Sequence, residues 1–241
     1  MRRLLGAFQF LTVIPIRGST APPWQCAAFF PIVGAALGAA GALILMASKP
    51  FWPVQVRTLL VVAFWVLITG ALHEDGLADV ADAFRAGRPR EEILAIMKDS
   101  RIGVFGGLAL VLSVVWRWQT LTAMRPDTLP ALTAALALSR ASIVVLARLS
   151  SPAAEGMGSA VAARVSAGAA AIAGLQGAVA GLLCGPVAAA ALTGTAAVVV
   201  LAARWFFHRH IGGVTGDCLG AGSQAVEMAL LGVLACRSCM W

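Results

Sequence analysis

The acidic residues of this chain gather in one short segment. Seven of the eleven lie between Glu74 and Asp99, directly after an apolar run without a charge. Asp75, Asp79 and Asp82 follow the spacing i, i+4, i+7, which places them along one edge of a helix. Bare carboxylates on one edge repel each other, and carboxylate oxygens are the ligands that Mg²⁺ takes in proteins. The spacing therefore predicts a helix that binds Mg²⁺ through these side chains.

The simpler alternative is that this stripe is only a solvated polar face. Against it, apolar residues occupy the complementary positions of the same segment, so the stripe is narrow and the predicted helix is amphipathic: Leu77, Val80, Ala81 and Phe84. We favour the metal site. Asp99, which begins the sequence Asp-Ser-Arg-Ile-Gly before the next apolar run, is expected to complete it.

His73 directly precedes the stripe and is a candidate general base. Its imidazole titrates near neutral pH without any perturbation, as general-base catalysis requires. The alternative for a single histidine at this place is a hydrogen-bonded residue at the end of a membrane helix.

Glycines beside hydroxyl or charged residues form a second kind of signal. They occur at 100–107 and at 212–222, and both segments are expected to be loops that lead into helices. Glycine lets backbone amides approach a phosphate closely, and a helix start favours anions. Arg140 lies within an apolar run, so it either faces the interior of the protein or extends to the membrane surface.

The elements that hold these residues are expected to be membrane helices. Of 241 residues, 60% are hydrophobic and 12% are charged, against about 25% charged residues in soluble domains. The apolar runs are long rather than alternating, which indicates helices and not a β-barrel. The net charge of +7 comes from scattered basic residues without a patch, so nucleic-acid binding is not expected.

The sequence predicts an all-α, polytopic bundle of six or seven membrane helices in a single domain, 1–241. A span needs about 20 mostly apolar residues. The candidate spans are Cys26 to Ser48, Val56 to Leu72, Gly103 to Thr122, Leu129 to Leu149, two within Ala167 to Ala203, and a short, partial one from Ala225 to Cys236.

The distribution of Lys and Arg predicts the orientation of the bundle, because short basic loops stay in the cytoplasm. This rule places the segments 1–25, 85–101, 150–166 and 204–224 in the cytoplasm, and residues 49–57, 125 and 185–186 on the other side. The functional acidic loop at 73–102 then faces the cytoplasm.

The chain resembles the cobalamin synthases, the adenosylcobinamide-GDP ribazoletransferases. The segments that carry the resemblance are FLTVIPI at 10–16, HEDGLADVADAF at 73–84, MKDSRIGVFGG at 97–107 and GGVTGDCLGA at 212–221. They extend over nearly the whole chain. One difference is that the chain has Asp82-Ala83 where the family usually has Asp-Gly.

The resemblance implies a Mg²⁺-dependent transferase in the bacterial inner membrane that joins adenosylcobinamide-GDP to α-ribazole or its 5′-phosphate and releases GMP. Besides these small molecules and the lipid bilayer no partner is implied, and a homo-oligomer stays open. The expected metal ligands are Asp75, Asp79, Asp82 and Asp99, and the catalytic candidates are His73 and Asp82. The expected substrate and phosphate contacts are Ser100, Arg101, Gly103, Arg140, Gly216 and Asp217.

Two other functions fit parts of the pattern. A CDP-alcohol phosphotransferase also carries aspartates on membrane helices, but its Asp-Gly is followed by Ala-Arg, whereas Asp75-Gly76 is followed by Leu77-Ala78. An ion-coupled transporter would place its carboxylates near the middle of the bilayer, whereas the acidic stripe is expected at the end of a span.

Overall fold

The computed structural model describes residues 1–16, 18, 20–85, 87–124 and 128–236, and in this part of the chain the protein is helical without a strand. The helices are α1 (Arg2–Leu11), α2 (Pro23–Cys26), η1 (Ala27–Phe29), α3 (Phe30–Ala47), α4 (Val54–Thr69), α5 (Leu72–Ala83), α6 (Arg90–Ile96), α7 (Val104–Ala123), α8 (Thr128–Arg148), α9 (Met157–Arg164), α10 (Ala167–Gly181), η2 (Leu182–Cys184), α11 (Pro186–Ile211) and α12 (Gly216–Ala235).

The predicted helical bundle is confirmed. Six helical segments of the described chain are long and apolar enough to cross a membrane, and α4 with α5 would make a seventh if this bent pair counts as one span. The prediction for the last helix was wrong, because α12 has 20 residues and begins at Gly216 rather than at Ala225. α12 is a complete candidate span. Its start was missed because its first two turns consist mostly of small residues, which the hydropathy pattern does not distinguish from a loop.

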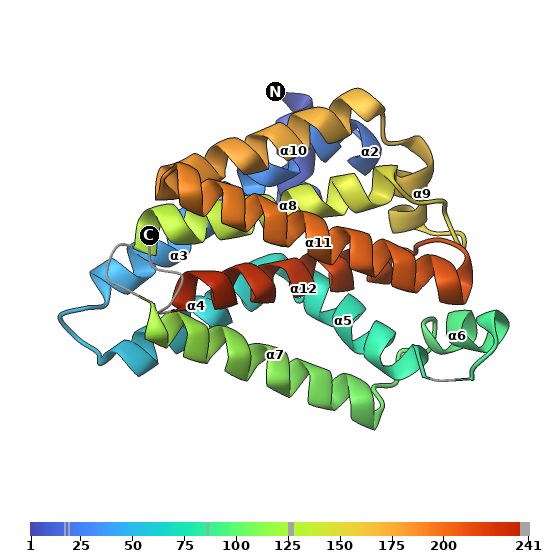
Figure 1. Ribbon diagram of the computed structural model, residues 1–241, viewed down its shortest axis with the longest axis horizontal. Helices are drawn as coiled ribbons and strands as arrows, with labels where there is room; N and C mark the ends of the chain where they lie inside the picture. Colours follow the sequence, from blue (N-terminus) through green and yellow to red (C-terminus); the bar gives the residue numbers. More distant parts are fainter. Residues whose placement is uncertain (17, 19, 86, 125–127, 237–241) are drawn as a thin grey trace.

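The connections between the long helices lie at two opposite ends of the bundle. Figure 1 shows α6, α9 and the turn between α11 and α12 at one end, and the α3–α4 and α10–α11 turns at the other. This arrangement agrees with the alternation that the basic residues predicted for the described loops. Residue 125 lies outside the described residues.

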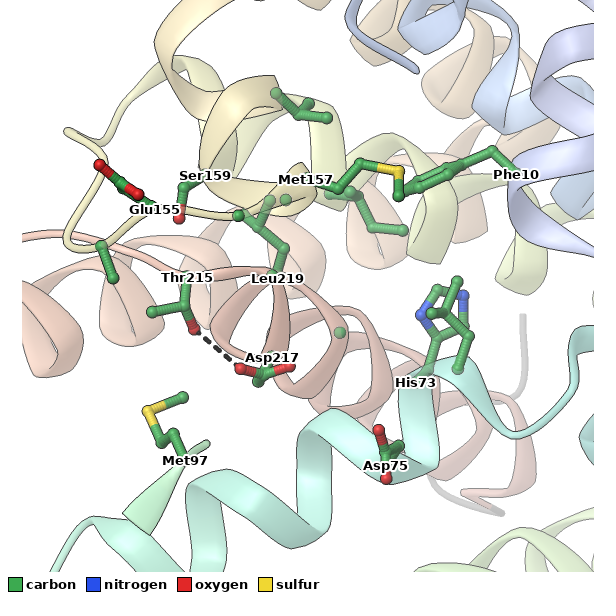
Figure 2. A pocket seen from close by; sticks show the side chains of 18 of the residues that line it. Phe10, His73, Asp75, Met97, Glu155, Met157, Ser159, Thr215, Asp217 and Leu219 are labelled. Carbon is green, nitrogen blue, oxygen red and sulfur yellow. Dashed lines mark hydrogen bonds between the residues drawn. The ribbon is translucent and has the colours of Figure 1, made fainter. Parts of the chain in front are cut away.

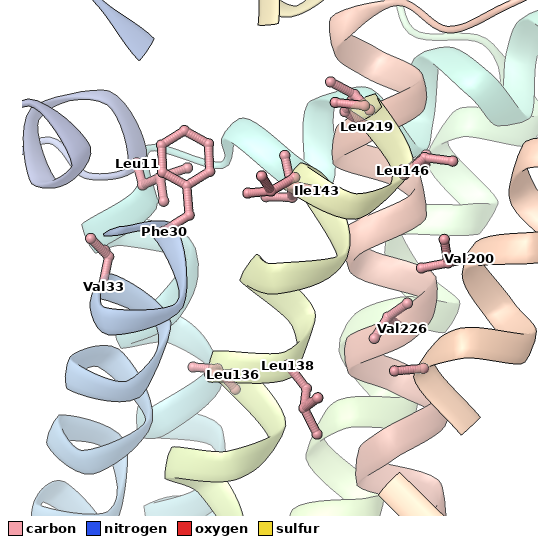
Figure 3. Packing of buried hydrophobic residues seen from close by; sticks show 14 of the residues in the cluster. Leu11, Phe30, Val33, Leu136, Leu138, Ile143, Leu146, Val200, Leu219 and Val226 are labelled. Atoms are coloured by element: carbon pink, nitrogen blue, oxygen red, sulfur yellow. The ribbon is translucent and has the colours of Figure 1, made fainter. Parts of the chain in front are cut away.

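Close helix contacts form the core of the bundle. A side chain at Gly34 or Gly38 would collide with the backbone of α8 at Leu136 or Leu132, so α3 and α8 pack almost backbone to backbone. Figure 3 shows the larger apolar side chains that fill the remaining space between α3, α8, α11 and α12. Small residues at this contact allow the two helices to pack closely.

A sharp bend places α5 across the bundle. The axes of α4 and α5 differ by 89°. Gly70 and Ala71 form the bend, and both have left-handed backbone angles, with φ of 61° and 57°. The backbone N–H of Val13 donates to the carbonyl of Ile68 at 2.8 Å, which ties the segment after α1 to this corner. The acidic stripe therefore begins within the bundle and extends toward the end that carries α6.

Candidate functional site

The acidic stripe lies on α5, as its spacing predicted, and faces a fourth carboxylate on α12. Gly76 makes this approach possible, because a Cβ at this position would lie 2.7 Å from the carbonyl oxygen of Asp217. Asp75, Asp217 and Asp82 all lie close enough to Asp79 to repel its charge. The sequence assigned Asp217 to a separate glycine-rich loop, whereas the fold brings it to the stripe.

Asp75, Asp79 and Asp217 line a hollow of about 470 Å³, which we call the acidic hollow. It is lined by α5, by the segment after α6 and by the start of α12. Its polar residues include most of the site residues that the sequence predicted, together with Glu74 and Lys98: Asp75, Asp79, Asp99, Ser100, Arg101 and Asp217. Side chains from segments more than 100 residues apart thus meet at one place.

Asp82 has a different position from the one predicted. Its carboxylate accepts hydrogen bonds from the backbone N–H groups of Gly103, at 2.7 Å, and Gly106, at 2.9 Å. It therefore caps the N-terminus of α7, where backbone donors have no partner within the helix and negative charge is favoured. Asp82 does not line the acidic hollow, and its carboxylate is engaged by these two backbone N–H groups. Gly103 likewise serves the cap.

Asp99 is engaged by Arg101. The guanidinium of Arg101 donates to both carboxylate oxygens, at 2.6 Å from Nη2 to Oδ2 and 3.0 Å from Nε to Oδ1. These hydrogen bonds lower the pKa of Asp99 to about 2. Both side chains lie on the surface, and that of Arg101 is 88% exposed. Asp99 is therefore the partner of a basic residue at the mouth of the hollow rather than a free fourth ligand.

A second hollow of about 310 Å³ lies next to the first, and we call it the apolar hollow. Most of its wall is apolar, from Phe10, Leu11, Phe30, Leu72, Ile143, Met157, Val161 and Leu219. Figure 2 shows Met157 and Ser159 from α9, Thr215 directly before α12, and Asp217 in the first turn of α12. Asp75, Met97, Lys98 and Asp217 line both hollows, so the two adjoin.

His73 lines the apolar hollow and not the acidic one. Its side chain is buried, and its Nε2 has no hydrogen-bond partner among the described residues. A buried polar atom without a partner is costly in a finished core and is common where a ligand binds. The geometry thus places His73 beside the stripe but turns it toward a different space.

The glycine-rich segment 212–222 is a loop only in its first part. α12 begins at Gly216, so residues 216–222 belong to the helix and not to a phosphate loop. The side chain of Thr215 accepts a hydrogen bond from the N–H of Cys218 at 3.3 Å and caps the helix. Gly216 lines the apolar hollow and packs against Gly158 of α9, where a Cβ would collide with the backbone of Gly216.

Arg140 lines neither hollow, but it takes part in a buried ionic network that includes Glu74, a residue of the acidic hollow. Its Nη1 lies 2.9 Å from Oε2 of Glu227, and Nη1 of Arg117 lies 2.7 Å from Oε1 of Glu74. Glu227 also lies 3.5 Å from Arg117 and joins the two pairs. All four side chains are buried. The alternative of an interior Arg140 was therefore right, and its carboxylate partner is Glu227.

Sequence reasoning missed several members of these sites. Glu74 and Glu227 had no partner that spacing could identify, because Arg117 and Arg140 come from other helices. Lys98 lines both hollows but appeared only as one basic residue of a loop. Its position next to Asp99, directly before the glycine-rich segment 100–107, could have identified it as a site residue.

Comparison with known proteins identifies the family. The model of the cobalamin-5-phosphate synthase family matches residues 3–235. This chain belongs to that family. Members of the cobalamin-5-phosphate synthase family are transferases of cobalamin biosynthesis, and the chain is therefore an enzyme.

Three curated relatives match this chain over nearly their full length, and all three are named adenosylcobinamide-GDP ribazoletransferase. The protein of Ralstonia nicotianae is 39% identical, covering 97% of this chain and 94% of the relative. That of Azorhizobium caulinodans is 41% identical, covering 95% and 94%. That of Chlorobaculum tepidum is 36% identical, covering 99% and 97%. No solved structure matches the chain.

Proposed function

We propose that this cobalamin-5-phosphate synthase family member joins adenosylcobinamide-GDP to α-ribazole, or to its 5′-phosphate, with Mg²⁺ at the acidic hollow. A ribose hydroxyl oxygen of the acceptor forms a bond to the phosphorus that carries the aminopropanol arm of the corrinoid. The bond from this phosphorus to the oxygen of GMP breaks, and the proton of the hydroxyl passes to a carboxylate of the hollow. The products are adenosylcobalamin, or its phosphate, and GMP.

The observation that supports this proposal is the composition of the acidic hollow. Carboxylates from α5 and α12 face basic and hydroxyl side chains from the segment after α6: Lys98, Ser100 and Arg101. A diphosphate needs cations around its oxygens, and the carboxylates provide a place for one of them. The family match and the names of the relatives support this choice of substrates.

The donor set fits Mg²⁺ in a restricted way. In the described part of the chain, no group of three or more Asp, Glu, His or Cys side chains is compact enough to hold a metal ion alone. Mg²⁺ usually binds through one or two carboxylates and fills its other positions with water and substrate phosphates. We assign it to Asp75 and Asp79, one turn apart on α5, with Asp217 facing them. When bound, Mg²⁺ would neutralise charge on the phosphates of the donor.

The basic side chains have the complementary task. Lys98 lies between the two hollows, and Arg101 with Ser100 lies at the outer wall of the acidic one. A flexible ammonium and an exposed guanidinium can both follow charge that develops on the leaving GMP. Without substrate, the carboxylate of Asp99 binds the guanidinium of Arg101. A substrate phosphate would compete with this carboxylate for the guanidinium.

The same proposal includes the orientation of the enzyme in the inner membrane. Basic residues are concentrated in the segments at the end that carries α6 and α9, which favours the cytoplasm for this end. The acidic hollow opens near Arg101 and Ser100, beside α6, so nucleotide substrates would reach it from the cytoplasm.

The test measures GMP release by the purified protein in detergent from adenosylcobinamide-GDP and α-ribazole, over a series of Mg²⁺ concentrations. We expect turnover that disappears with EDTA and returns with Mg²⁺. Asp79→Asn should lose most turnover, whereas Glu92→Gln on exposed α6 should keep it. Full activity of Asp79→Asn would overturn the metal assignment, and no GMP from the wild-type protein would overturn the proposed reaction.

A further inference from the structure

The proposed reaction uses the acidic hollow and leaves the apolar hollow beside it without a task. Leu72, Ile143 and Leu219 contribute to its apolar wall, and Phe10 and Phe30 contribute aromatic rings. Buried apolar residues normally fill such a space, because protein interiors are close-packed. A hollow of about 310 Å³ that the chain itself leaves open therefore has the properties of a ligand site.

The position of the apolar hollow limits what it can bind. Asp75 and Asp217 line both hollows, so a ligand bound in the apolar hollow can extend into the acidic one. A ligand that does so is apolar at one end and reaches the reacting phosphate with the other. A nucleoside has this form when its base carries few polar groups.

The size of the hollow selects between the two substrates. Small-molecule sites have volumes of about 300–1,000 Å³, and about 310 Å³ is at the lower end of this range. A corrinoid ring is far larger than one nucleoside. The guanine of the donor is small enough, but it carries several polar groups at its edge, and an apolar wall would leave most of them without partners.

Among the described residues of this wall, His73 carries the one buried polar ring. The imidazole lines the hollow, and Nε2 finds no partner among the described residues. Neutral imidazole carries one N–H donor and one acceptor nitrogen. It can therefore form a hydrogen bond to a base that is apolar apart from a single ring nitrogen.

We propose that the apolar hollow binds the heterocyclic base of the acceptor nucleoside, with His73 hydrogen-bonded to its free ring nitrogen. This assignment rests on the proposed function and specifies the position of the acceptor within it. The base packs against Phe10, Phe30 and Met157, and the ribose extends past Asp75 toward the acidic hollow. His73 is then a residue of acceptor binding and not the general base.

The first experiment fills the apolar hollow at an exposed residue. Met157 lines the hollow and is 61% exposed, so Met157→Trp can add bulk without disrupting the core. Met46 on α3 is 59% exposed and lines neither hollow, which makes Met46→Trp a matched control. We expect Met157→Trp to raise the KM for α-ribazole by about tenfold or more and to change the KM for adenosylcobinamide-GDP by less than about twofold. Met46→Trp should change neither.

The second experiment tests His73 by direct binding without turnover. Equilibrium dialysis compares α-ribazole with an analogue in which the free ring nitrogen is replaced by C–H. One hydrogen bond is worth about three- to tenfold in affinity, so the wild-type protein should bind the analogue more weakly by this factor. His73→Phe should bind both ligands equally, and monodispersity of the variant shows that it has folded. Should it fail to fold, His73→Leu, which also lacks a hydrogen-bonding group, takes its place.

The outcomes separate this proposal from the proposed function. A Met157→Trp enzyme with an unchanged KM for α-ribazole and a raised KM for adenosylcobinamide-GDP would overturn the assignment while the reaction stands. Equal binding of both nucleosides by the wild-type protein would overturn the role of His73. Binding of α-ribazole that Met157→Trp abolishes, without GMP release by the wild-type protein, would support the apolar hollow and sink the proposed reaction.

Discussion

The carboxylate of Asp82 accepts a hydrogen bond from the backbone N–H of Gly103 at 2.7 Å, and so fixes the last turn of α5 to the first turn of α7. A second bond from Gly106 strengthens this link. The segment between the two helices carries Ser100 and Arg101. The hydrogen bonds of Asp82 therefore set where this segment lies relative to Asp79. Asp82 thus has a structural role, whereas Asp79 is the proposed metal ligand.

Replacement of Asp82 should consequently differ from replacement of Asp79 in its dependence on Mg²⁺. Asp82→Ala removes the acceptor from two N–H groups, and loss of a helix cap costs about 0.5–2 kcal/mol of stability. We expect a lower melting temperature and reduced activity with an unchanged Mg²⁺ concentration for half-maximal rate. Asp79→Asn should instead raise that Mg²⁺ concentration and keep the melting temperature. The reverse pattern would return Asp82 to the metal site.

The buried network predicts a large effect on stability at Glu227. Glu227→Ala leaves both Arg140 and Arg117 with one carboxylate fewer in the interior. Breaking a buried ion pair costs about 3–5 kcal/mol. We expect Glu227→Ala to lose its monodisperse peak on gel filtration at a much lower temperature than the wild-type protein.

Glu92 provides the control for this measurement. It pairs with Arg88 at 3.2 Å on the surface, with its side chain 51% exposed. Exposed pairs contribute about 0–1 kcal/mol, so Glu92→Ala should remain close to the wild-type protein. If Glu227→Ala lost its monodisperse peak at a temperature as close to that of the wild-type protein as Glu92→Ala does, the network would not stabilise the bundle.

The approach of α5 to α12 makes Gly76 sensitive to the smallest substitution. A Cβ at Gly76 would lie 2.7 Å from the carbonyl oxygen and 2.9 Å from the Cα of Asp217, so Gly76→Ala must push the helices apart. Overpacking of this kind costs about 1–3 kcal/mol. It also moves Asp217 away from the stripe, so we expect activity to fall by at least about tenfold. Gly194→Ala on α11 meets open space and should keep both stability and activity.

The helical bundle and the acidic stripe could be predicted from sequence because both depend on local order. Apolar length determines a membrane helix, and the spacing of Asp75 and Asp79 determines one edge of α5. The start of α12 was missed because glycine and small residues are common both in loops and in close-packed membrane helices. In this chain Gly216 and Gly220 both lie in the first turns of α12, where they contact α9 and α5.

The partners of the charged residues could not be predicted from one sequence. Arg140 and Glu227 are 87 residues apart, and nothing in their local spacing relates them. The same is true of Asp217, which reaches the stripe only because Gly76 lets two helices touch. Asp82 was expected at the metal because its spacing matches the stripe. Its capping of α7 depends on a tertiary contact across more than twenty residues.

The pair of Asp99 and Arg101 predicts how activity responds to pH. Hydrogen bonds from Arg101 lower the pKa of Asp99 to about 2, below the usual value of about 3.9. A depressed pKa in the folded protein means that the stabilising contribution is present above the unfolded value and is lost as pH falls toward 2. Asp99 therefore stays ionised from pH 5 to 9. We expect Asp99→Asn to scale the pH–rate profile in this range without changing its shape, as GMP release at saturating substrate would measure. A shifted acid limb in that variant would mean that Asp99 takes up a proton during turnover.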